Sequence, residues 1–225
     1  MGLRVYLGSC LIGAHVDWVP VFLLRSSSLT PSPSIQHLSI QYPTSFQTVH
    51  SSVMSLEAIK YTRGELQVLD QLRLPHESIY VSIKTSEDGH RAIHRMVVRG
   101  APAIAIVAAL SLAVELESLR DLSEFTPDSI HEHIKKALDY LNTSRPTAVN
   151  LSDAVTKLKA AVAKEVVRGG STAQTVVAVY QDCAESMLEK DVADNKNIGK
   201  FGAEWLLKAV ESGGKISVLT HCNTG

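Results

Sequence analysis

The sequence predicts a mixed α/β fold: a mostly helical domain with a few short strands, followed by the first strand of a second α/β unit. Three observations support this prediction. Short strand-like runs follow Met54, helical spacing of apolar residues dominates from Ser86 onward, and a buried-strand pattern returns at residues 216–219. The length of 225 residues is enough for one large domain or two small ones.

Residues 1–53 differ in composition from the rest of the chain. Their only charged side chains are Arg4, Asp17 and Arg25, and residues 26–52 are rich in Ser, Thr, Pro and Gln. Such a segment packs poorly, so we expect a disordered leader ahead of a domain that spans residues 54–213 and begins at Met54, itself a start codon candidate. A secretory signal is the alternative, but no small-residue cleavage site precedes Asp17.

Short strands are expected at the start of this domain, at residues 56–61, 65–69 and 78–83. Breaks at Arg63-Gly64 and at Pro75 separate them.

Helices follow the strands. Amphipathic spacing predicts helices over residues 86–98, 102–119, 127–141, 152–169, 172–191 and 198–211. Thr126 is placed to cap the third of these helices, with Pro127 at its first position. Residues 100–114 carry no charge, but the run is too short for a membrane span and indicates a helix buried in a protein core.

The last strand, residues 216–219, leads into Thr220-His221-Cys222-Asn223-Thr224-Gly225 and the sequence stops. A strand without a following crossover helix cannot complete an α/β unit. We therefore expect residues 214–225 to be the beginning of a truncated second domain.

The overall charge restricts the class of partner. The chain has 22 Lys and Arg against 23 Asp and Glu, a formal net charge of −1. Nucleic acids and anionic membranes need clustered basic residues, so neither is expected as a partner. The three cysteines, Cys10, Cys183 and Cys222, form no CxxC pair, which indicates a reducing compartment, the cytosol, and no structural zinc site.

Three segments could carry chemistry. Arg99-Gly100-Ala101-Pro102 combines a cation, a glycine and a helix N-terminus, as phosphate sites do, although an ordinary loop-to-helix junction looks the same. In residues 145–150, Pro146 holds Arg145 in an extended loop, where the alternative is a solvated arginine. Cys222 follows a buried strand, where open α/β sheets bind ligands, and it is either a nucleophile or acid/base, or an inert buried thiol.

The histidines do not suggest a metal site. His131 and His133 point to different helix faces, and His90 and His94 lack a third ligand nearby in sequence.

Four segments in this order resemble the methylthioribose-1-phosphate isomerase family of methionine salvage, including its vertebrate-type enzymes. They are residues 54–61, 98–104, 145–150 and 220–225. The resemblance implies a mostly helical N-terminal domain joined to a Rossmann-like C-terminal domain, in an enzyme that is commonly a homodimer.

The resemblance also implies roles for individual residues. Arg99, Gly100, Ala101 and Arg145 match substrate-binding positions, and Cys222 matches the catalytic cysteine. The implied substrate is a small sugar phosphate, 5-methylthioribose 1-phosphate, which is isomerised to 5-methylthioribulose 1-phosphate without an external cofactor.

This chain also departs from the family. The catalytic aspartate of the family lies beyond Gly225, so we expect a truncated member that is inactive alone. Two alternatives stay open: a regulatory subunit related to the alpha subunit of translation initiation factor 2B, and a ribose-1,5-bisphosphate isomerase. The resemblance is compatible with the cytosol and leaves a nuclear pool open.

Overall fold

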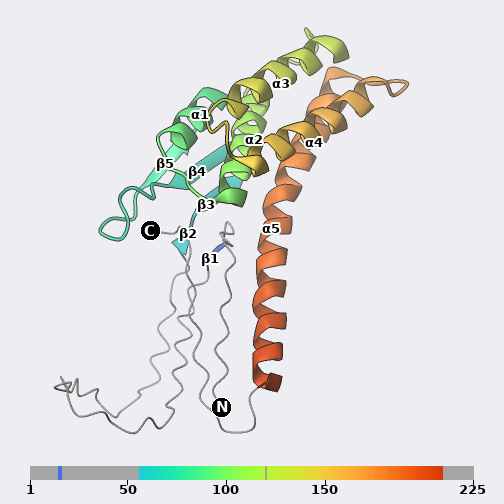
Figure 1. Cartoon of the computed structure of the whole chain (residues 1–225). Coiled ribbons are helices and arrows are strands. Elements are labelled where there is room, and N and C mark those ends of the chain that lie inside the picture. Colours follow the sequence, from blue (N-terminus) through green and yellow to red (C-terminus); the bar gives the residue numbers. More distant parts are fainter. Residues whose placement is uncertain (1–14, 17–55, 120, 210–225) are drawn as a thin grey trace, which may run out of the picture.

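The computed structural model describes residues 15–16, 56–119 and 121–209 (Figure 1). The expected domain boundaries at residues 53/54 and 213/214, the strand at residues 216–219, Cys10 and Cys222 lie outside these residues. Of the predicted leader, only His15–Val16 (β1) is described, and it pairs antiparallel with Leu56–Glu57 (β2).

An antiparallel sheet in the order β3-β4-β5 forms one side of the fold. Its strands are Ile59–Thr62 (β3), Glu65–Leu69 (β4) and Tyr80–Ile83 (β5). The prediction for residues 65–69 is confirmed, whereas the predicted strand at 56–61 is divided, because the chain leaves β2 at Ala58 before it joins the sheet as β3. Gly64 occupies the β3–β4 turn with φ +87°, a backbone conformation that favours glycine.

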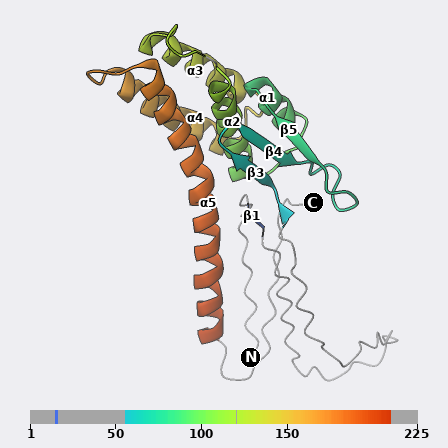
Figure 2. The ribbon, with the colours of Figure 1, turned by 180° about the vertical axis from the view of Figure 1, so that it is seen from behind.

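The helices make up most of the described chain and pack above and beside the sheet (Figures 1 and 2). They are Ser86–His94 (α1), Ala101–Glu117 (α2), Pro127–Asn142 (α3), Val149–Val166 (α4) and Ala173–Ala209 (α5). The predicted cap is confirmed, since Thr126 Oγ1 accepts from the Ser129 amide at 3.1 Å and Ser129 Oγ accepts from the Thr126 amide at 2.9 Å.

Helix α2 lies at the centre and contacts α1, α4, α5 and the strands β3 and β4. Nearly all of its side chains are apolar and buried, as expected for a helix that is surrounded by protein. The prediction of a helix buried in a protein core is confirmed. No helix within the described residues is long and apolar enough to cross a membrane.

Helices α1 and α2 pack so closely that position 89 of α1 must be a glycine. A Cβ atom added to Gly89 of α1 would lie 2.3 Å from Oγ and 2.5 Å from Cβ of Ser111 on α2. Helix α1 can therefore approach α2 only because residue 89 has no side chain.

The prediction of separate helices over residues 172–191 and 198–211 is wrong, because α5 is continuous from Ala173 to Ala209. The polar residues between the two predicted segments support the helix instead of ending it. Asn195 Nδ2 donates to the Asp191 carbonyl oxygen at 2.8 Å, and Lys190 pairs with Asp194 at 2.6 Å, both at i,i+4 spacing.

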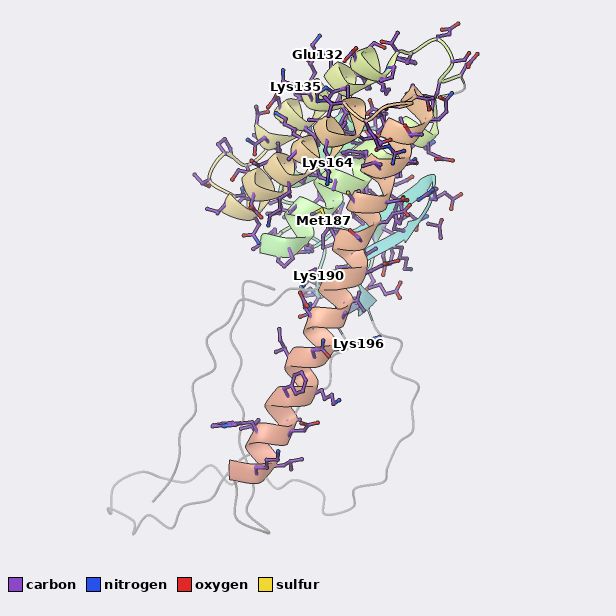
Figure 3. All side chains as sticks on the ribbon, turned by 90° about the vertical axis from the view of Figure 1, so that its right-hand side faces the viewer. Glu132, Lys135, Lys164, Met187, Lys190 and Lys196 are labelled. Carbon is purple, nitrogen blue, oxygen red and sulfur yellow. The ribbon has the colours of Figure 1, made fainter. Side chains whose placement is uncertain are left out.

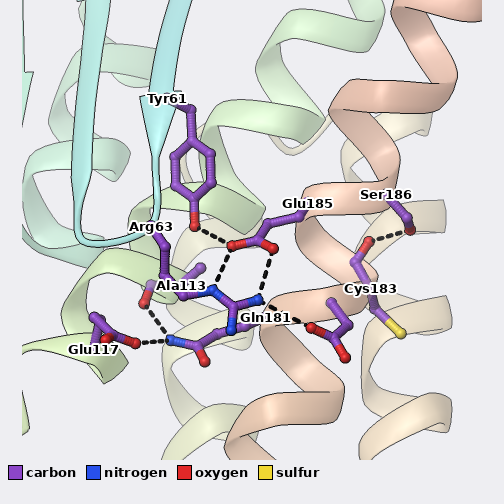
Figure 4. Close-up of polar contacts among 9 residues, drawn as sticks. Tyr61, Arg63, Ala113, Glu117, Gln181, Cys183, Glu185 and Ser186 are labelled. Carbon is purple, nitrogen blue, oxygen red and sulfur yellow. Dashed lines mark hydrogen bonds and ion pairs between the residues drawn. The ribbon is translucent and has the colours of Figure 1, made fainter.

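The first half of α5 is anchored in the core and to the sheet. Tyr180, fully buried, donates its hydroxyl to the Ala109 carbonyl of α2 at 3.0 Å, and Gln181 Nε2 donates to Glu117 Oε2 at 2.7 Å. One turn further along, Glu185 accepts from Tyr61 and Arg63 of the β3–β4 hairpin (Figure 4). These contacts join the hairpin, α2 and α5 into one unit.

Candidate functional site

The N-terminus of α2 has the geometry of an anion-binding segment. Gly100 precedes the helix with φ +102° and ψ 145°, a conformation that is open to glycine and strained for other residues. Pro102 occupies the first turn, and no side chain caps the helix. Free amide N–H groups and the helix dipole therefore face the approach to this end of α2.

Arg99 lies directly before this terminus and is half-buried. Its Nη2 atom donates to the main-chain oxygen of Gln71 at 3.0 Å. Its Nε atom is buried and has no hydrogen-bond partner within the described part of the chain. The guanidinium is thus held at one edge by the Gln71 carbonyl, while its Nε–H has no partner within the described residues.

Arg145 occupies the corresponding place before α4. The prediction that this helix starts at Ser152 is wrong: it begins at Val149, so Asn150 belongs to the first turn. The Ala148 amide donates to the Arg145 carbonyl at 2.9 Å in a tight turn, which brings the half-buried Arg145 close to the helix N-terminus. The residue at the N-cap, Ala148, has no side chain that could cap α4.

The other helices differ from these two. A threonine side chain caps α1, α3 and α5, since Thr85, Thr126 and Thr172 each accept from a first-turn amide. Only α2 and α4, among the described helices, begin without a side-chain cap at the positions where the sequence analysis expects substrate-binding arginines.

Both of these termini border one groove. It has a volume of about 860 Å³ and lies between α2, α4 and α5, with Pro102 of α2 and Asn150 of α4 in its wall. Figure 3 labels Met187 and Lys190, which line the groove where α5 leaves the helical bundle. The wall contains both apolar and charged side chains. The apolar ones are Ala105, Ile106, Ala154, Leu158, Met187, Ile198 and Phe201. The charged ones are Asp153, Lys157, Lys190, Asp191 and Asp194.

The structure brings the predicted segments to this groove only in part. Neither Arg99 nor Arg145 belongs to its wall, and each stands one turn or so before a wall residue of its own helix. Gly100 and Ala101 form the N-terminus of α2 itself, and Cys222 lies outside the described residues.

Cys183 also lines the groove, from α5. Burial, assisted by the nearby Asp182 carboxylate, raises the pKa of its thiol above the ordinary value. The thiol is therefore protonated at neutral pH and is a poor nucleophile. The prediction that Cys183 belongs to a helix core is confirmed insofar as it is partly buried against the hydrophobic core.

The histidines pack against other side chains. The His90 ring stacks on Tyr140, with centroids 4.3 Å apart, and its Nε2 lies 3.0 Å from Thr143 Oγ1. His133 Nε2 lies 3.6 Å from Glu115 Oε1. No cluster of three or more His, Cys, Asp or Glu side chains in the described residues is arranged to hold a metal ion.

Sequence analysis missed Gln71, which is buried and contacts Arg99. A weak signal existed, because Gln71 follows the apolar end of the predicted strand at residues 65–69, where a polar side chain has few reasons to be buried. Its partner could not be identified from the sequence, since the two residues are 28 positions apart.

The arrangement can bind a phosphate group and an apolar substituent together. Two uncapped helix N-termini and two arginines supply N–H donors and positive charge, and the adjoining groove supplies an apolar wall.

Comparison with known proteins identifies the family of this chain. Residues 97–225 match the model of the Initiation factor 2 subunit family. Over 175 residues the chain is 53% identical to a methylthioribose-1-phosphate isomerase from Aspergillus terreus, covering 76% of this chain and 46% of the relative. An enzyme of the same name from Vitis vinifera is 52% identical over 174 residues, covering 76% of this chain and 45% of the relative.

Two solved structures of related proteins resemble the fold of this chain. A 5-methylthioribose 1-phosphate isomerase from Pyrococcus horikoshii aligns with a TM-score of 0.59 at 28% identity, over 65% of this chain and 40% of that one. The delta subunit of the translation initiation factor eIF-2B from A. fulgidus aligns with a TM-score of 0.57 at 32% identity, over 69% of this chain and 42% of that one. The mixed, mostly helical fold is thus confirmed, while the expected Rossmann-like part is outside the described residues. This chain spans about half the length of the curated relatives it matches, and it belongs to the Initiation factor 2 subunit family.

Proposed function

We propose that this chain carries the substrate-phosphate-binding half of an isomerase that converts 5-methylthioribose 1-phosphate to 5-methylthioribulose 1-phosphate. The observation that carries the proposal is the pair of uncapped helix N-termini, each preceded by an arginine, that border one groove. About half of the aligned residues are identical in proteins named methylthioribose-1-phosphate isomerase, and this supports the choice of reaction.

Each residue then has a defined task. Arg99, with the amides of Gly100 and Ala101, binds the phosphate through charge-assisted hydrogen bonds, and Arg145 adds a second cation. The apolar side chains in the wall of the groove accommodate the 5-methylthio group. This wall favours a methylthio group over a second phosphate, which argues against ribose 1,5-bisphosphate as the substrate.

The reaction itself is redox-neutral. An acid protonates the ring oxygen while the C1–O bond to it breaks. The hydrogen of C2 then passes to C1 and the C2 hydroxyl returns its proton to the deprotonated acid, so that C2 is oxidised to the ketone as C1 is reduced. Cys222 is the residue proposed to assist the hydrogen transfer. The aligned region is 46% of the length of the isomerase relative. We propose that the 225-residue chain binds the sugar phosphate and does not turn it over.

An isomerase assay on a chimera tests this function. The chimera joins residues 1–225 to the part of the Aspergillus terreus relative that follows the aligned region, and it is compared with the 225-residue chain. We expect ketose formation from the chimera alone and its loss in Cys222→Ser, while Arg145→Ala raises KM at least tenfold. Cys183→Ser is the matched control and should retain activity. An active 225-residue chain would contradict the proposed inactivity, and a folded but inactive chimera would contradict the reaction.

A regulatory subunit is the second candidate, favoured by the similarity to the eIF-2B delta subunit. It predicts a chimera that binds sugar phosphates without turnover. Calorimetric titration of the inactive chimera with 5-methylthioribose 1-phosphate distinguishes it from a protein that has lost the site.

A further inference from the structure

Gln71 connects the end of β4 to the segment that enters α2. Its amide N–H donates to the Val97 carbonyl at 3.0 Å, and its carbonyl accepts from Arg99 Nη2 at 3.0 Å. Its side-chain Nε2 donates in return to the Arg99 carbonyl at 3.4 Å. Gln71 thus contacts both the main chain and the side chain of Arg99.

The position of Gln71 is itself fixed by the chain around it. The Asp70 amide donates to the Ile79 carbonyl at 2.8 Å, and Asp70 Oδ1 accepts from the Leu72 amide at 3.0 Å, which starts a turn at Gln71. Gln71 is only 8% exposed. A buried residue at the end of a paired strand is a rigid support for a neighbouring side chain.

Arg99 needs such a support. A free arginine side chain has many rotamers, and ordering them on ligand binding costs conformational entropy. The bond from Nη2 to Gln71 fixes the plane of the guanidinium before any ligand arrives. Arg99 Nε is buried and has no hydrogen-bond partner among the described residues, so one N–H of the held guanidinium is left unsatisfied.

We propose that Gln71 is a positioning residue that holds Arg99 ready to bind an anionic phosphate at the N-terminus of α2. This inference rests on the proposed function, because it takes Arg99 as a phosphate ligand. Gln71 itself does not touch the substrate. It acts through the main-chain oxygen that orients the guanidinium and through the side-chain amide that holds the Arg99 backbone.

The test uses the 225-residue chain and two variants. Gln71→Met keeps the side-chain length and removes the amide, and Gln67→Met makes the same change on the exposed face of β4. Two quantities are measured: the rotation rate of the Arg99 guanidinium by ¹⁵N NMR without ligand, and the Kd for inorganic phosphate from the shifts of the Gly100 and Ala101 amides. Thermal unfolding shows that each variant is folded.

Gln71→Met leaves the Gln71 carbonyl in place but removes the side-chain bond that holds the Arg99 main chain, so the guanidinium is no longer kept in register with that carbonyl. We therefore expect faster guanidinium rotation and a Kd for phosphate that is about fivefold higher, the equivalent of one lost hydrogen bond. Gln67→Met should change neither quantity. An unchanged rotation rate in folded Gln71→Met overturns the positioning role. Faster rotation with an unchanged Kd overturns it as well and leaves Gln71 a structural residue. Absence of phosphate binding by the unaltered chain overturns the phosphate site, and with it both proposals.

Discussion

Arg63 in the β3–β4 turn and Glu185 on α5 form a bidentate ion pair across 122 sequence positions. Arg63 Nε donates to Oε1 at 2.9 Å and Nη2 donates to Oε2 at 2.7 Å, while the Tyr61 hydroxyl donates to the same Oε1 at 2.7 Å (Figure 4). The fork geometry and the partial burial of Glu185 distinguish this pair from the exposed i,i+4 pairs elsewhere.

This ion pair predicts a pH-dependent stability. The hydrogen bonds from Arg63, and then the one from Tyr61, lower the pKa of Glu185 below its ordinary value of 4.5. A lowered pKa in the folded state means that the stabilisation is complete above about pH 4.5 and is lost as the pH falls through the folded-state pKa. Glu185→Gln should therefore lower the free energy of unfolding by about 1 kcal/mol at pH 7 and by much less at pH 3.

Urea unfolding of both proteins at the two pH values measures this difference. The exposed pair of Lys157 with Asp153 provides the control, and Asp153→Asn should have little effect at either pH. A Glu185→Gln effect of equal size at pH 3 and pH 7 would show that packing, and not charge, is responsible.

Gly89 and Gly202 predict opposite effects of the same substitution. Gly89→Ala would push a methyl group into Ser111, and overpacking of this kind costs about 1–3 kcal/mol. Gly202 lies in α5 with nothing within 4 Å of an added Cβ, so Gly202→Ala should stabilise the protein by about 0.5–1 kcal/mol through helix propensity. Differential scanning calorimetry gives both signs, and a stabilised Gly89→Ala would contradict the close approach of α1 and α2.

Gly100 predicts a combined loss of stability and ligand binding. Its φ of +102° is strained for any other residue, so Gly100→Ala should destabilise the fold by roughly 1–3 kcal/mol and weaken phosphate binding at least fivefold. Gly170→Ala introduces comparable strain, at φ +80°, in the loop before α5. It should lower stability without changing the Kd for phosphate, and equal Kd effects in the two variants would remove Gly100 from the site.

Substitutions at Thr126 measure how much the reciprocal cap of α3 contributes to the free energy of unfolding. Thr126→Ala removes the acceptor of the Ser129 amide and should cost about 1 kcal/mol of unfolding free energy, measured by chemical denaturation. Thr126→Ser retains the acceptor and should cost a few tenths of that amount. A similar loss in both variants would point to the methyl group of Thr126 instead of the cap.

Much of the helical fold could be predicted because its signals are local. The uncharged run at residues 100–114 identified the buried α2, and Thr126-Pro127 located the start of α3, since both depend on residues within a few positions. The continuity of α5 could not be predicted in the same way. Polar residues such as Asp191 and Asn195 are compatible with a loop or an exposed helix, and only the i,i+4 bonds decide.

The segments of the candidate site could also be located from local motifs. The structure places Arg99, Gly100 and Ala101 at the N-terminus of α2 and Arg145 ahead of α4, while their role in substrate binding stays a prediction. The start of α4 at Val149 and the contact of Gln71 with Arg99 required three-dimensional placement. The Gln71–Arg99 contact has no sequence pattern, because the two residues come from separate elements.

Among the described residues, α5 packs against the hydrophobic core through its N-terminal half only. This packing ends at Leu188, whereas Ile198, Phe201 and Trp205 further along are exposed. At a rise of 1.5 Å per residue, the stretch from Leu188 to Ala209 is about 30 Å long. If this stretch tilted by about 10° about Leu188, its C-terminal end would move by about 5 Å. A small change in packing near Leu188 therefore produces a much larger displacement at Ala209.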